Sequence, residues 1–379
     1  MHIIHIGKFY PPYRGGMETY LRDLAAAQVR QGHQVTVIVH NHDWQRISSQ
    51  TSRQCIDGVQ VIRLRSLKPW LHTPIMLGLN RCIRQLMTTN RPDLIHLHSP
   101  NPSLFWLLFN GQAKSLPWVL SWHSDMVTQF SSTLLKLIYR LIKPFENKLI
   151  KHCQSILVSS QYYADGSPQL KYHQQKVKVI PLGIDTQKIS EVAINDTTEE
   201  FGVGNQFNLF SLGRLTFYKN QQMLIAAMKQ LSHYQLLLAG SGQLHEQLQQ
   251  QINDMDVNDQ VKLLGEVSEA KAQQLFAHCD VFCLASHDRA ESFGVVLLEA
   301  MYHNKIILVA DTEGSGMRWL AENYQKGFTF KANDVEDFVR VVQHIRENYQ
   351  EIMARPAQFD YDIDTIAQVI EQNSYTQLT

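Results

Sequence analysis

Short apolar runs alternate with segments of helical periodicity along most of the chain. The runs are rich in Val, Ile and Leu, which indicates buried strands of a parallel sheet. We expect such strands at residues 2–7, 34–39, 59–65, 94–98, 119–122, 155–160, 177–182, 208–212, 235–239, 261–264, 281–285 and 306–310. Repeated strand, helix, strand units of this kind predict an α/β protein.

The length of the chain and the order of these units predict two domains. A chain of 379 residues exceeds what one hydrophobic core usually organises. The strand and helix pattern restarts at 208–212, and the polar tract 196–205 before it is typical of a surface connection. We therefore place the boundary near residue 185.

Net charge is zero over the whole chain but divides unevenly between its halves. Residues 1–184 hold 21 Lys and Arg against 8 Asp and Glu, and the remainder holds 14 against 27. The basic half is expected to face an anionic partner, although association between the two halves would also explain the division.

Two segments of the basic half, 67–86 and 134–152, have the pattern of basic amphipathic helices. Such helices lie on anionic membrane surfaces, but a helix that packs on a sheet and exposes its lysines has the same pattern. Their position in the basic half favours membrane contact.

The N-terminus and the cysteines indicate a reducing, cytoplasmic location. The chain opens with a strand pattern and has no apolar run of 18 residues, so neither a signal peptide nor a membrane span is expected. The cysteine number, five, is odd, and the cysteines are scattered, which favours free thiols. Cys279 and Cys283 lack histidines at metal-ligand spacing and are expected to be core thiols.

The stretch 288–304 carries two acids whose surroundings differ. Ser292 is expected to cap a helix that begins at Phe293 and is apolar on almost every side. Glu299 would lie inside that helix and Glu291 just outside it. A buried carboxylate must meet a cation or hydroxyl donors. A sugar nucleotide offers such hydroxyls, but a helix-cap acid plus a buried salt bridge would also explain the pair.

Glycines and basic residues follow several of the predicted strands. Gly15 and Gly16 would let backbone amides approach a phosphate, although paired glycines also make plain turns. Gly213 allows a tight turn before Arg214, and Lys219 adds a second cation, which together predict a diphosphate site. His123 follows a strand end, where groups that bind ligands collect, or it is a structural hydrogen-bonder.

These motifs resemble those of the retaining glycosyltransferases of family four in the glycogen-synthase-like clan. The resemblance rests on Glu-x7-Glu within Glu291-Ser292-Phe293-Gly294 and Leu298-Glu299-Ala300-Met301. It implies the GT-B fold, with two Rossmann-like doubly wound domains facing across a cleft. The first, 1–184, would bind the acceptor and receive the tail 360–379, and the second, 185–359, would bind the donor. Asn304 and Ile306 replace the family's usual Gly and Pro, and Asn tolerates the same left-handed cap.

The resemblance also implies a role for each site residue. Arg214 and Lys219 would hold the donor diphosphate in place of a metal ion, so neither a metal nor a cofactor is expected. Glu299 would bind the ribose, and His123 would touch the donor sugar. Glu291 would bind the sugar hydroxyls. The remaining donor-site residues would be Gly15, Gly16, Gly213, Val267, Ser292, Phe293 and Gly294.

The resulting hypothesis is retaining transfer of a hexose from a nucleoside diphosphate to a glycan or lipid-linked acceptor in cell-surface polysaccharide or lipopolysaccharide synthesis. The surroundings of His123 and Glu291 favour a GDP-mannose donor over UDP-hexoses, because they look most like mannosyl and rhamnosyl transferases. No nucleic acid partner is expected. The alternatives are a sugar-nucleotide epimerase and a non-enzymatic nucleotide-sugar sensor. A dehydrogenase is disfavoured, since no Gly-x-Gly-x-x-Gly follows the first strand.

Overall fold

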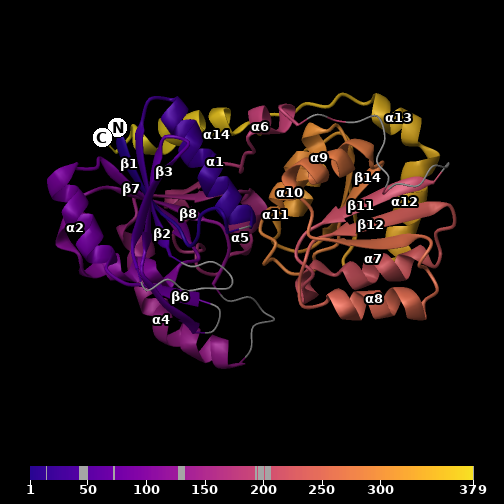
Figure 1. The fold of residues 1–379 in the computed structure, drawn as a ribbon, viewed down its shortest axis with the longest axis horizontal. Helices are drawn as coiled ribbons and strands as arrows, with labels where there is room; N and C mark the ends of the chain where they lie inside the picture. The colour runs from indigo at the N-terminus through magenta and orange to yellow at the C-terminus, as the bar shows by residue number, and fades with distance from the viewer. Residues whose placement is uncertain are drawn as a thin grey trace. The chain divides into compact units, whose positions relative to one another are not determined.

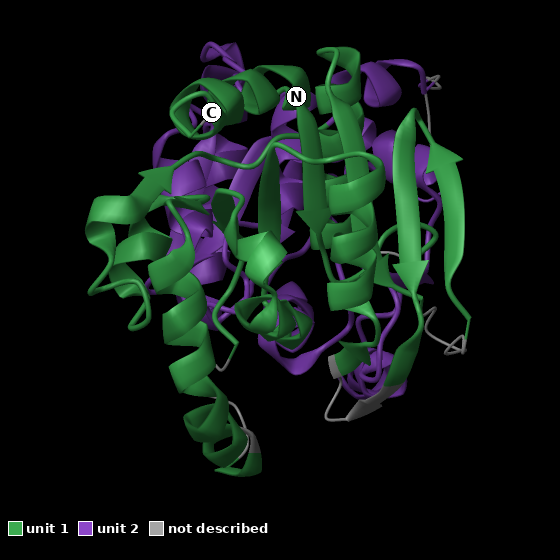
Figure 2. Ribbon diagram, turned by 90° about the vertical axis from the view of Figure 1, so that its left-hand side faces the viewer, with its two compact units in different colours: residues 1–184, 361–379 green, residues 185–360 purple. Residues whose placement is uncertain are grey.

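The computed structural model describes residues 1–13, 15–41, 50–70, 73–126, 133–192, 194, 200 and 206–378. These residues form two compact units, each with its own sheet of mainly parallel strands (Figures 1 and 2). Unit 1 comprises Met1–Ile184 and Tyr361–Thr379, and unit 2 comprises Asp185–Asp360. Of the polar tract 196–205, only Glu200 is among the described residues.

Unit 1 is built on an eight-stranded sheet with the order β10-β9-β8-β7-β1-β2-β4-β3. All neighbouring strands are parallel except β3, which pairs antiparallel with β4. The strands are β1 (His2–Ile6), β2 (Gln34–His40), β3 (Ser52–Ile56), β4 (Val59–Leu64), β7 (Leu94–Ser99), β8 (Trp118–Trp122), β9 (Ser155–Val158) and β10 (Val177–Val179). The chain reverses its direction across the sheet between β1 and β7, and ligands bind at such switch points in open α/β sheets.

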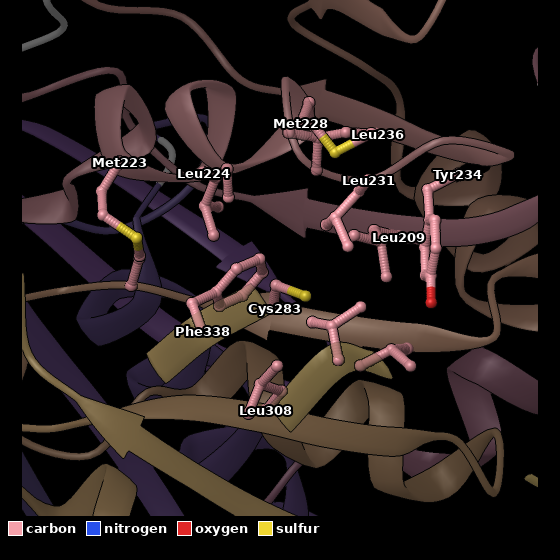
Figure 3. Packing of buried hydrophobic residues seen from close by; sticks show 14 of the residues in the cluster. Leu209, Met223, Leu224, Met228, Leu231, Tyr234, Leu236, Cys283, Leu308 and Phe338 are labelled. Atoms are coloured by element: carbon pink, nitrogen blue, oxygen red, sulfur yellow. The ribbon is translucent and has the colours of Figure 1, made fainter. Parts of the chain in front are cut away.

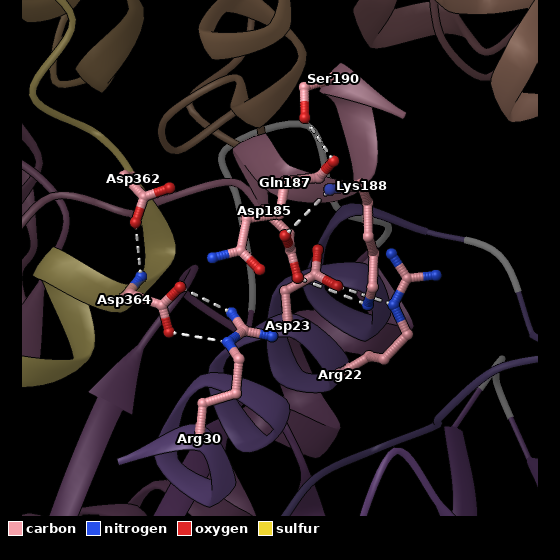
Figure 4. A network of polar contacts seen from close by, with 9 residues as sticks. All are labelled: Arg22, Asp23, Arg30, Asp185, Gln187, Lys188, Ser190, Asp362 and Asp364. Carbon is pink, nitrogen blue, oxygen red and sulfur yellow. Dashed lines mark hydrogen bonds and ion pairs between the residues drawn. The ribbon is translucent and has the colours of Figure 1, made fainter. Parts of the chain in front are cut away.

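The helices of unit 1 include the C-terminal tail of the chain. They are α1 (Gly16–Arg30), α2 (Leu79–Thr89), α3 (Gly111–Lys114), α4 (Thr133–His152), α5 (Gln161–Gly166) and α14 (Ile363–Ile370), with 3-10 turns η1 (Pro102–Phe109) and η2 (Gln174–Lys176) and a final turn η4 (Glu371–Tyr375). Helix α14 packs on α1, where the Arg30 guanidinium donates two hydrogen bonds of 2.9 Å to Asp364 (Figure 4). The tail is thus part of the first unit, as the resemblance implied.

The prediction of an amphipathic helix over 67–86 was wrong for its first half. That part forms an antiparallel hairpin of β5 (Ser66–Trp70) and β6 (Thr73–Met76), and α2 begins only at Leu79. Pro69 and Pro74 explain the difference, because a proline inside a helix removes a backbone donor and clashes with the preceding turn. The second segment does form one helix, α4.

Unit 2 has a six-stranded parallel sheet with the order β13-β12-β11-β14-β15-β16. Its strands are β11 (Phe207–Leu212), β12 (Tyr234–Ala239), β13 (Val261–Gly265), β14 (Val281–Leu284), β15 (Ile306–Asp311) and β16 (Gly327–Lys331). Its helices are α6 (Thr186–Ser190), the 3-10 turn η3 (Phe217–Lys219), α7 (Gln221–Met228), α8 (His245–Asp254), α9 (Glu269–His278), α10 (Val295–Tyr302), α11 (Gly316–Glu322), α12 (Val335–Glu347) and α13 (Tyr349–Ala354). Figure 1 shows α7 and α8 on one face of the sheet and α9 and α10 on the other, which makes the unit doubly wound. The chain reverses its direction across this sheet between β11 and β14.

The core of unit 2 lies between this sheet and the helices α7, α8 and α12 (Figure 3). Alternate residues of β11 and β12, such as Leu209 and Leu236, meet Leu224 of α7 and Phe338 of α12. Cys283 is buried among them as a free thiol, and Cys279 is also buried and free, so the expectation of core thiols is confirmed.

No helix among the described residues is both long and apolar enough to cross a membrane.

Helix α4 buries an acid beside its exposed face. Glu146 is 1% exposed, accepts a hydrogen bond from the Tyr139 hydroxyl, and its Oε1 has no partner among the described residues. Burial raises the pKa of Glu146 from 4.5 to about 7, and the hydrogen bond from Tyr139 opposes only part of that effect. The folded state therefore favours the protonated acid.

We predict that unit 1 loses stability as pH rises from about 4.5 through 7. Because the folded pKa of Glu146 is above the unfolded one, its contribution is fully present below pH 4.5 and lost as pH rises through the folded pKa. The loss should be about 3 kcal/mol at most. Hydrogen exchange of the α4 amides, corrected for intrinsic rates, should show it in the parent chain and not in Glu146→Gln. Substitution of an exposed acid, Asp165→Asn, should leave the pH dependence unchanged, and a parent-like slope in Glu146→Gln would contradict the assignment.

Candidate functional site

The predicted acids and cations of unit 2 gather at the switch point of its sheet. Arg214 and Lys219 follow β11, and Glu291 follows the neighbouring strand β14. Because both strands are parallel, the two loops leave the same edge of the sheet.

Lys219 and Glu291 form an ion pair in which both side chains are largely shielded from solvent. The Lys219 side chain is 10% exposed and that of Glu291 is 14% exposed. Burial alone would lower the pKa of Lys219, but the Glu291 carboxylate, with a smaller effect of Tyr218, offsets this and the pKa is raised. Lys219 is therefore a cation at neutral pH, held against a carboxylate. From the sequence the two residues had separate roles, and only the structure joins them.

Hydrogen bonds to backbone carbonyls join these two loops to each other and to the loop after β15. The His287 N–H donates to the Tyr218 carbonyl at 2.9 Å, and the Ser315 hydroxyl donates to the Glu291 carbonyl at 2.5 Å. Gly213 leaves room for the lysine, since a Cβ there would stand 3.3 Å from Lys219 Nζ. The ion pair is thus built on fixed backbone.

Arg214 lies at the exposed side of the same loop. Its guanidinium donates to the Tyr218 hydroxyl at 3.3 Å, and Gln221 Nε2 donates to its carbonyl at 3.0 Å. The loop after β12 packs beneath it, where the Ser241 carbonyl accepts from the Leu215 N–H at 2.9 Å. A Cβ at Gly240 would overlap the Gly213 carbonyl oxygen, so this glycine is needed for close packing of the two loops.

The predicted start of the helix after β14 was wrong. Helix α10 begins at Val295, its N-cap is Gly294 in the left-handed region with φ 77°, and no side chain caps it. Ser292 lies before this turn, where its carbonyl accepts from the Gly316 N–H at 2.8 Å. Glycine decides the boundary because it enters the left-handed region without the cost that a Cβ brings.

The backbone N–H groups of Phe293 and Gly294 are buried beside the start of α10. Of the residues that the structure describes, none accepts a hydrogen bond from either N–H. They precede an eight-residue helix and lie two and three residues after Glu291. The site therefore offers two backbone donors next to the ion pair of Lys219 and Glu291.

Glu299 has a different environment from the one expected. It is half-buried on α10, and the Gln273 side-chain amide of α9 donates to it at 2.6 Å. The His303 ring in turn contacts Gln273 Oε1 at 2.7 Å, and burial lowers the pKa of His303 to about 4. One partner of the inner acid is thus a neutral amide.

Val267 is half-buried in the loop between β13 and α9, at the same edge of the sheet.

In unit 1, the structure places the predicted glycines and His123 at the corresponding edge of the other sheet. Gly15 is the N-cap of α1, where a Cβ would collide with the Glu18 carboxylate, while a Cβ at Gly16 would meet nothing within 4 Å. His123 follows β8 and is 5% exposed. It lines a small hollow of about 10 Å³ with Tyr20 and Ser121.

Sequence reasoning missed the residues behind His123. His5 of β1 and His96 and His98 of β7 are buried in the sheet. Hydrogen bonds join His5 to His98 and His98 to His123. The signal was present in the spacing of His96 and His98, since residues two apart in a strand share one face. Isolated histidines in apolar runs gave no reason to connect them.

Comparison with known proteins identifies both halves of the chain. Residues 14–188 match the family "Glycosyltransferase Family 4", and residues 195–360 match "Glycosyl transferases group 1". The chain is 24% identical over 349 residues to the O-antigen chain mannosyltransferase C of Escherichia coli, covering 92% of this chain and 89% of that protein. It is 25% identical to the D-rhamnosyltransferase WbpZ of Pseudomonas aeruginosa, covering 71% of this chain and 68% of that protein.

The solved structures agree on the fold. Anabaena Alr3699/HepE in complex with UDP and glucose superposes with a TM-score of 0.74 at 21% identity, covering 99% of this chain and all of that one. Sucrose-phosphate synthase from Thermosynechococcus elongatus superposes with a TM-score of 0.74 at 17% identity, covering 100% of this chain and 98% of that one. The GT-B fold expected from the sequence is confirmed.

We predict that Lys219→Met destabilises unit 2 by about 3 kcal/mol, because it leaves Glu291 shielded without its cation. Lys271→Met is the matched control, since Lys271 pairs with Glu200 where the side chains are 35% and 24% exposed, and it should cost less than about 1 kcal/mol. Urea unfolding of the purified variants measures both. Adding Glu291→Gln to Lys219→Met should recover part of the loss. Equal losses in the two lysine variants would show that the ion pair is not shielded as described.

Proposed function

We propose that this chain, which belongs to the glycosyltransferases with a family 4 domain followed by a group 1 domain, transfers a hexose from a nucleoside diphosphate to a hydroxyl acceptor with retention of anomeric configuration. Unit 2 would bind the donor and unit 1 the acceptor. The observation that carries the proposal is the shielded pair of Lys219 and Glu291, close in the chain to the Phe293 and Gly294 amides, for which the described residues provide no acceptor.

The chemistry of this site suits a sugar diphosphate. Lys219 is cationic, and Arg214 presents a planar guanidinium at the exposed side of its loop, so the two can neutralise the leaving diphosphate without a metal ion. Glu291, paired with Lys219, accepts hydrogen bonds from sugar hydroxyls. Glu299 accepts from the ribose hydroxyls, with Gln273 holding its carboxylate. Val267 lies beside the base.

The retaining step needs no enzymic nucleophile in this proposal. The departing phosphate takes the proton of the acceptor hydroxyl while the new glycosidic bond forms on the face that the phosphate leaves. Glu291 serves binding, and His123 contacts the sugar from unit 1. The names of the relatives, a mannosyltransferase and a rhamnosyltransferase, support GDP-mannose as the donor and a surface glycan or lipid-linked sugar as the acceptor.

We predict that Arg214→Ala weakens binding of the donor about 10- to 100-fold, the range expected for a charge-assisted hydrogen bond, and leaves the fold intact because Arg214 is exposed. Arg340→Ala, which removes an exposed arginine of the same unit whose side chain is 70% accessible, is the control and should bind as the parent does. Thermal-shift screening against a panel of sugar nucleotides finds the donor, and calorimetry gives the affinities. Unchanged binding in Arg214→Ala would remove it from the diphosphate site.

Assays of the parent protein and of two site variants distinguish sugar transfer from epimerisation and from non-enzymatic sensing. Glu291→Ala and Lys219→Ala should lose transfer of sugar to the acceptor. If the parent turns over the donor without any acceptor, the chain is an epimerase. If it binds a hydrolysis-resistant donor and transfers nothing to a panel of acceptors, it is a sensor.

We also propose that α4 places the enzyme on an anionic membrane. Leu134, Leu137 and Leu141 are 56%, 59% and 70% exposed and follow one another at helical spacing on a single face. The helix also exposes Lys136, Arg140, Lys143 and Lys148. Phe109 of η1 extends the apolar strip, with its ring 6.3 Å from that of Phe145. An apolar face bordered by cations fits a surface of acidic lipids.

We predict that the double variant Leu137→Glu and Leu141→Glu partitions at least roughly tenfold more weakly onto vesicles with acidic lipids, since two exposed leucines lose their apolar burial. Its activity on a water-soluble acceptor should match the parent. Tyr172→Glu, at another exposed apolar side chain of unit 1, is the control for added charge and should float with the vesicles. Equal flotation of the double variant would place the contact elsewhere.

A further inference from the structure

Four histidines form a continuous hydrogen-bonded group inside the sheet of unit 1. His5 lies on β1, His96 and His98 on β7, and His123 directly after β8. None is more than 5% exposed. The strand register brings them together, because His5 lies opposite His96 and the next residue on that face, His98, lies opposite Ser121.

One branch of this group runs from α1 to His123. Gln28 Oε1 lies 2.7 Å from His5 Nε2, His5 Nδ1 lies 3.0 Å from His98 Nε2, and His98 Nδ1 lies 2.9 Å from His123 Nε2. The planes of the His98 and His123 rings differ by 9°. Both nitrogens of His5 and of His98 are therefore used.

The second branch starts from the other end of the same amide. Gln28 Nε2 donates to the Tyr375 hydroxyl at 3.1 Å, that hydroxyl lies 2.5 Å from His96 Nδ1, and His96 Nε2 lies 2.7 Å from Ser121 Oγ. Tyr375 comes from the returning C-terminal tail and is fully buried.

The Gln28 amide sets the direction of every proton in both branches. Its oxygen can only accept, so His5 carries its proton on Nε2 and its Nδ1 must accept from His98. His98 then accepts from His123 on Nδ1, which puts the His123 proton on Nε2. In the second branch the tyrosine hydroxyl accepts from Gln28 and donates to His96, which leaves the His96 proton on Nε2 as well.

We propose that Gln28, acting through His5 and His98, fixes His123 in the tautomer whose proton is on Nε2 and whose Nδ1 is a hydrogen-bond acceptor. All four rings then hold the Nε2-protonated form, which is the intrinsically more stable form of a neutral histidine, so no ring opposes the direction set by the amide. Gln28, His5 and His98 are positioning residues, and none of them needs to touch a substrate.

Two observations support a neutral, directed His123. Burial lowers the pKa of His123 to about 4 and that of His5 to about 4, so both are uncharged at neutral pH. Among the described residues, no group pairs with His123 Nδ1, while Nε2 is committed to His98. The nitrogen left for a ligand is the one without a proton.

A metal ion fits this group less well. The ring nitrogens of His5, His96 and His98 lie within 4.8 Å of one another, which is close enough to bind one. However, each nitrogen already has a hydrogen-bond partner. The group itself contains no carboxylate to balance a divalent charge in this buried setting. Hydrogen bonds with a fixed proton order satisfy the same ring nitrogens without burying a divalent charge.

This inference deepens the proposed function and rests on it for its consequence. An acceptor nitrogen at position 123 selects a hydroxyl that donates, so His123 would orient the sugar by receiving a hydroxyl proton in a hydrogen bond. It supplies no charge and transfers no proton.

The tautomer is measured directly by long-range proton–nitrogen NMR of the protein labelled with ¹⁵N-histidine, with His123 assigned by comparison with His123→Gln. We expect His123 Nε2 to show the shift of a protonated ring nitrogen and Nδ1 that of an unprotonated one. A proton on His123 Nδ1 in the parent protein would overturn the proposal. It would mean that the Gln28 amide has the opposite orientation, which moves the proton of each ring in the first branch to its other nitrogen. Binding of one equivalent of zinc that shifts the His5, His96 and His98 signals would also overturn it.

Variants at His98 separate positioning from packing. His98→Asn keeps an acceptor near the Nδ1 position and should preserve the His123 tautomer, whereas His98→Leu removes that acceptor and should give a second signal from the Nδ1-protonated form. His98→Leu should lower kcat/KM for the donor about fivefold, the usual worth of one hydrogen bond, with His98→Asn near the parent. His2→Gln is the control, because His2 is buried in the neighbouring strand β1 but bonds to Asn90 and Thr36. An unchanged tautomer in folded His98→Leu would refute the relay.

The outcomes are distinguishable from failure of the proposed function. The NMR result requires no substrate, so the relay can hold in a protein that transfers no sugar. If His98→Leu does not fold, the tautomer of the parent and of His98→Asn still decides the proposal.

Discussion

The ion pair of Lys219 and Glu291 is the interaction on which the candidate site depends. Two charges that are each largely removed from water are tolerated only when they meet each other and when the surrounding backbone holds them in place. The bonds from His287 to Tyr218 and from Ser315 to Glu291 provide that support. The result is a cation and a carboxylate already oriented at a sheet edge, which reduces the reorganisation needed when a charged ligand arrives.

The same constraint operates in unit 1 with neutral groups. Buried imidazoles on the inner strands of a parallel sheet must satisfy both of their nitrogens. The histidines of β1 and β7 do so through one another, through Gln28 of α1 and through Tyr375 of the tail. The tail therefore contributes to the polar interior of the first unit as well as to its apolar packing through Ile363 and Ile366.

Local signals predicted most of the elements and some of the site. Apolar runs located the central strands within a residue or two, because buried parallel strands need continuous apolar sequence. They did not reveal β3, β5, β6 or β16, whose residues are more polar or lie next to prolines. The start of α10 was misplaced for a related reason. Ser292 is a good cap by composition, but the left-handed turn at Gly294 ends the loop two residues later.

By itself, the sequence determined the α/β class, the two-unit division near residue 185, the family resemblance and the identity of the acids and cations after β11 and β14. These follow from periodicity and from short motifs, which are local in the chain. Only the tertiary structure decided that Lys219 pairs with Glu291, that Gln273 holds Glu299 and that hydrogen bonds join His5 to His98 and His98 to His123. Each of these contacts joins residues at least 25 positions apart, and strand order and register, which no local pattern encodes, bring them together.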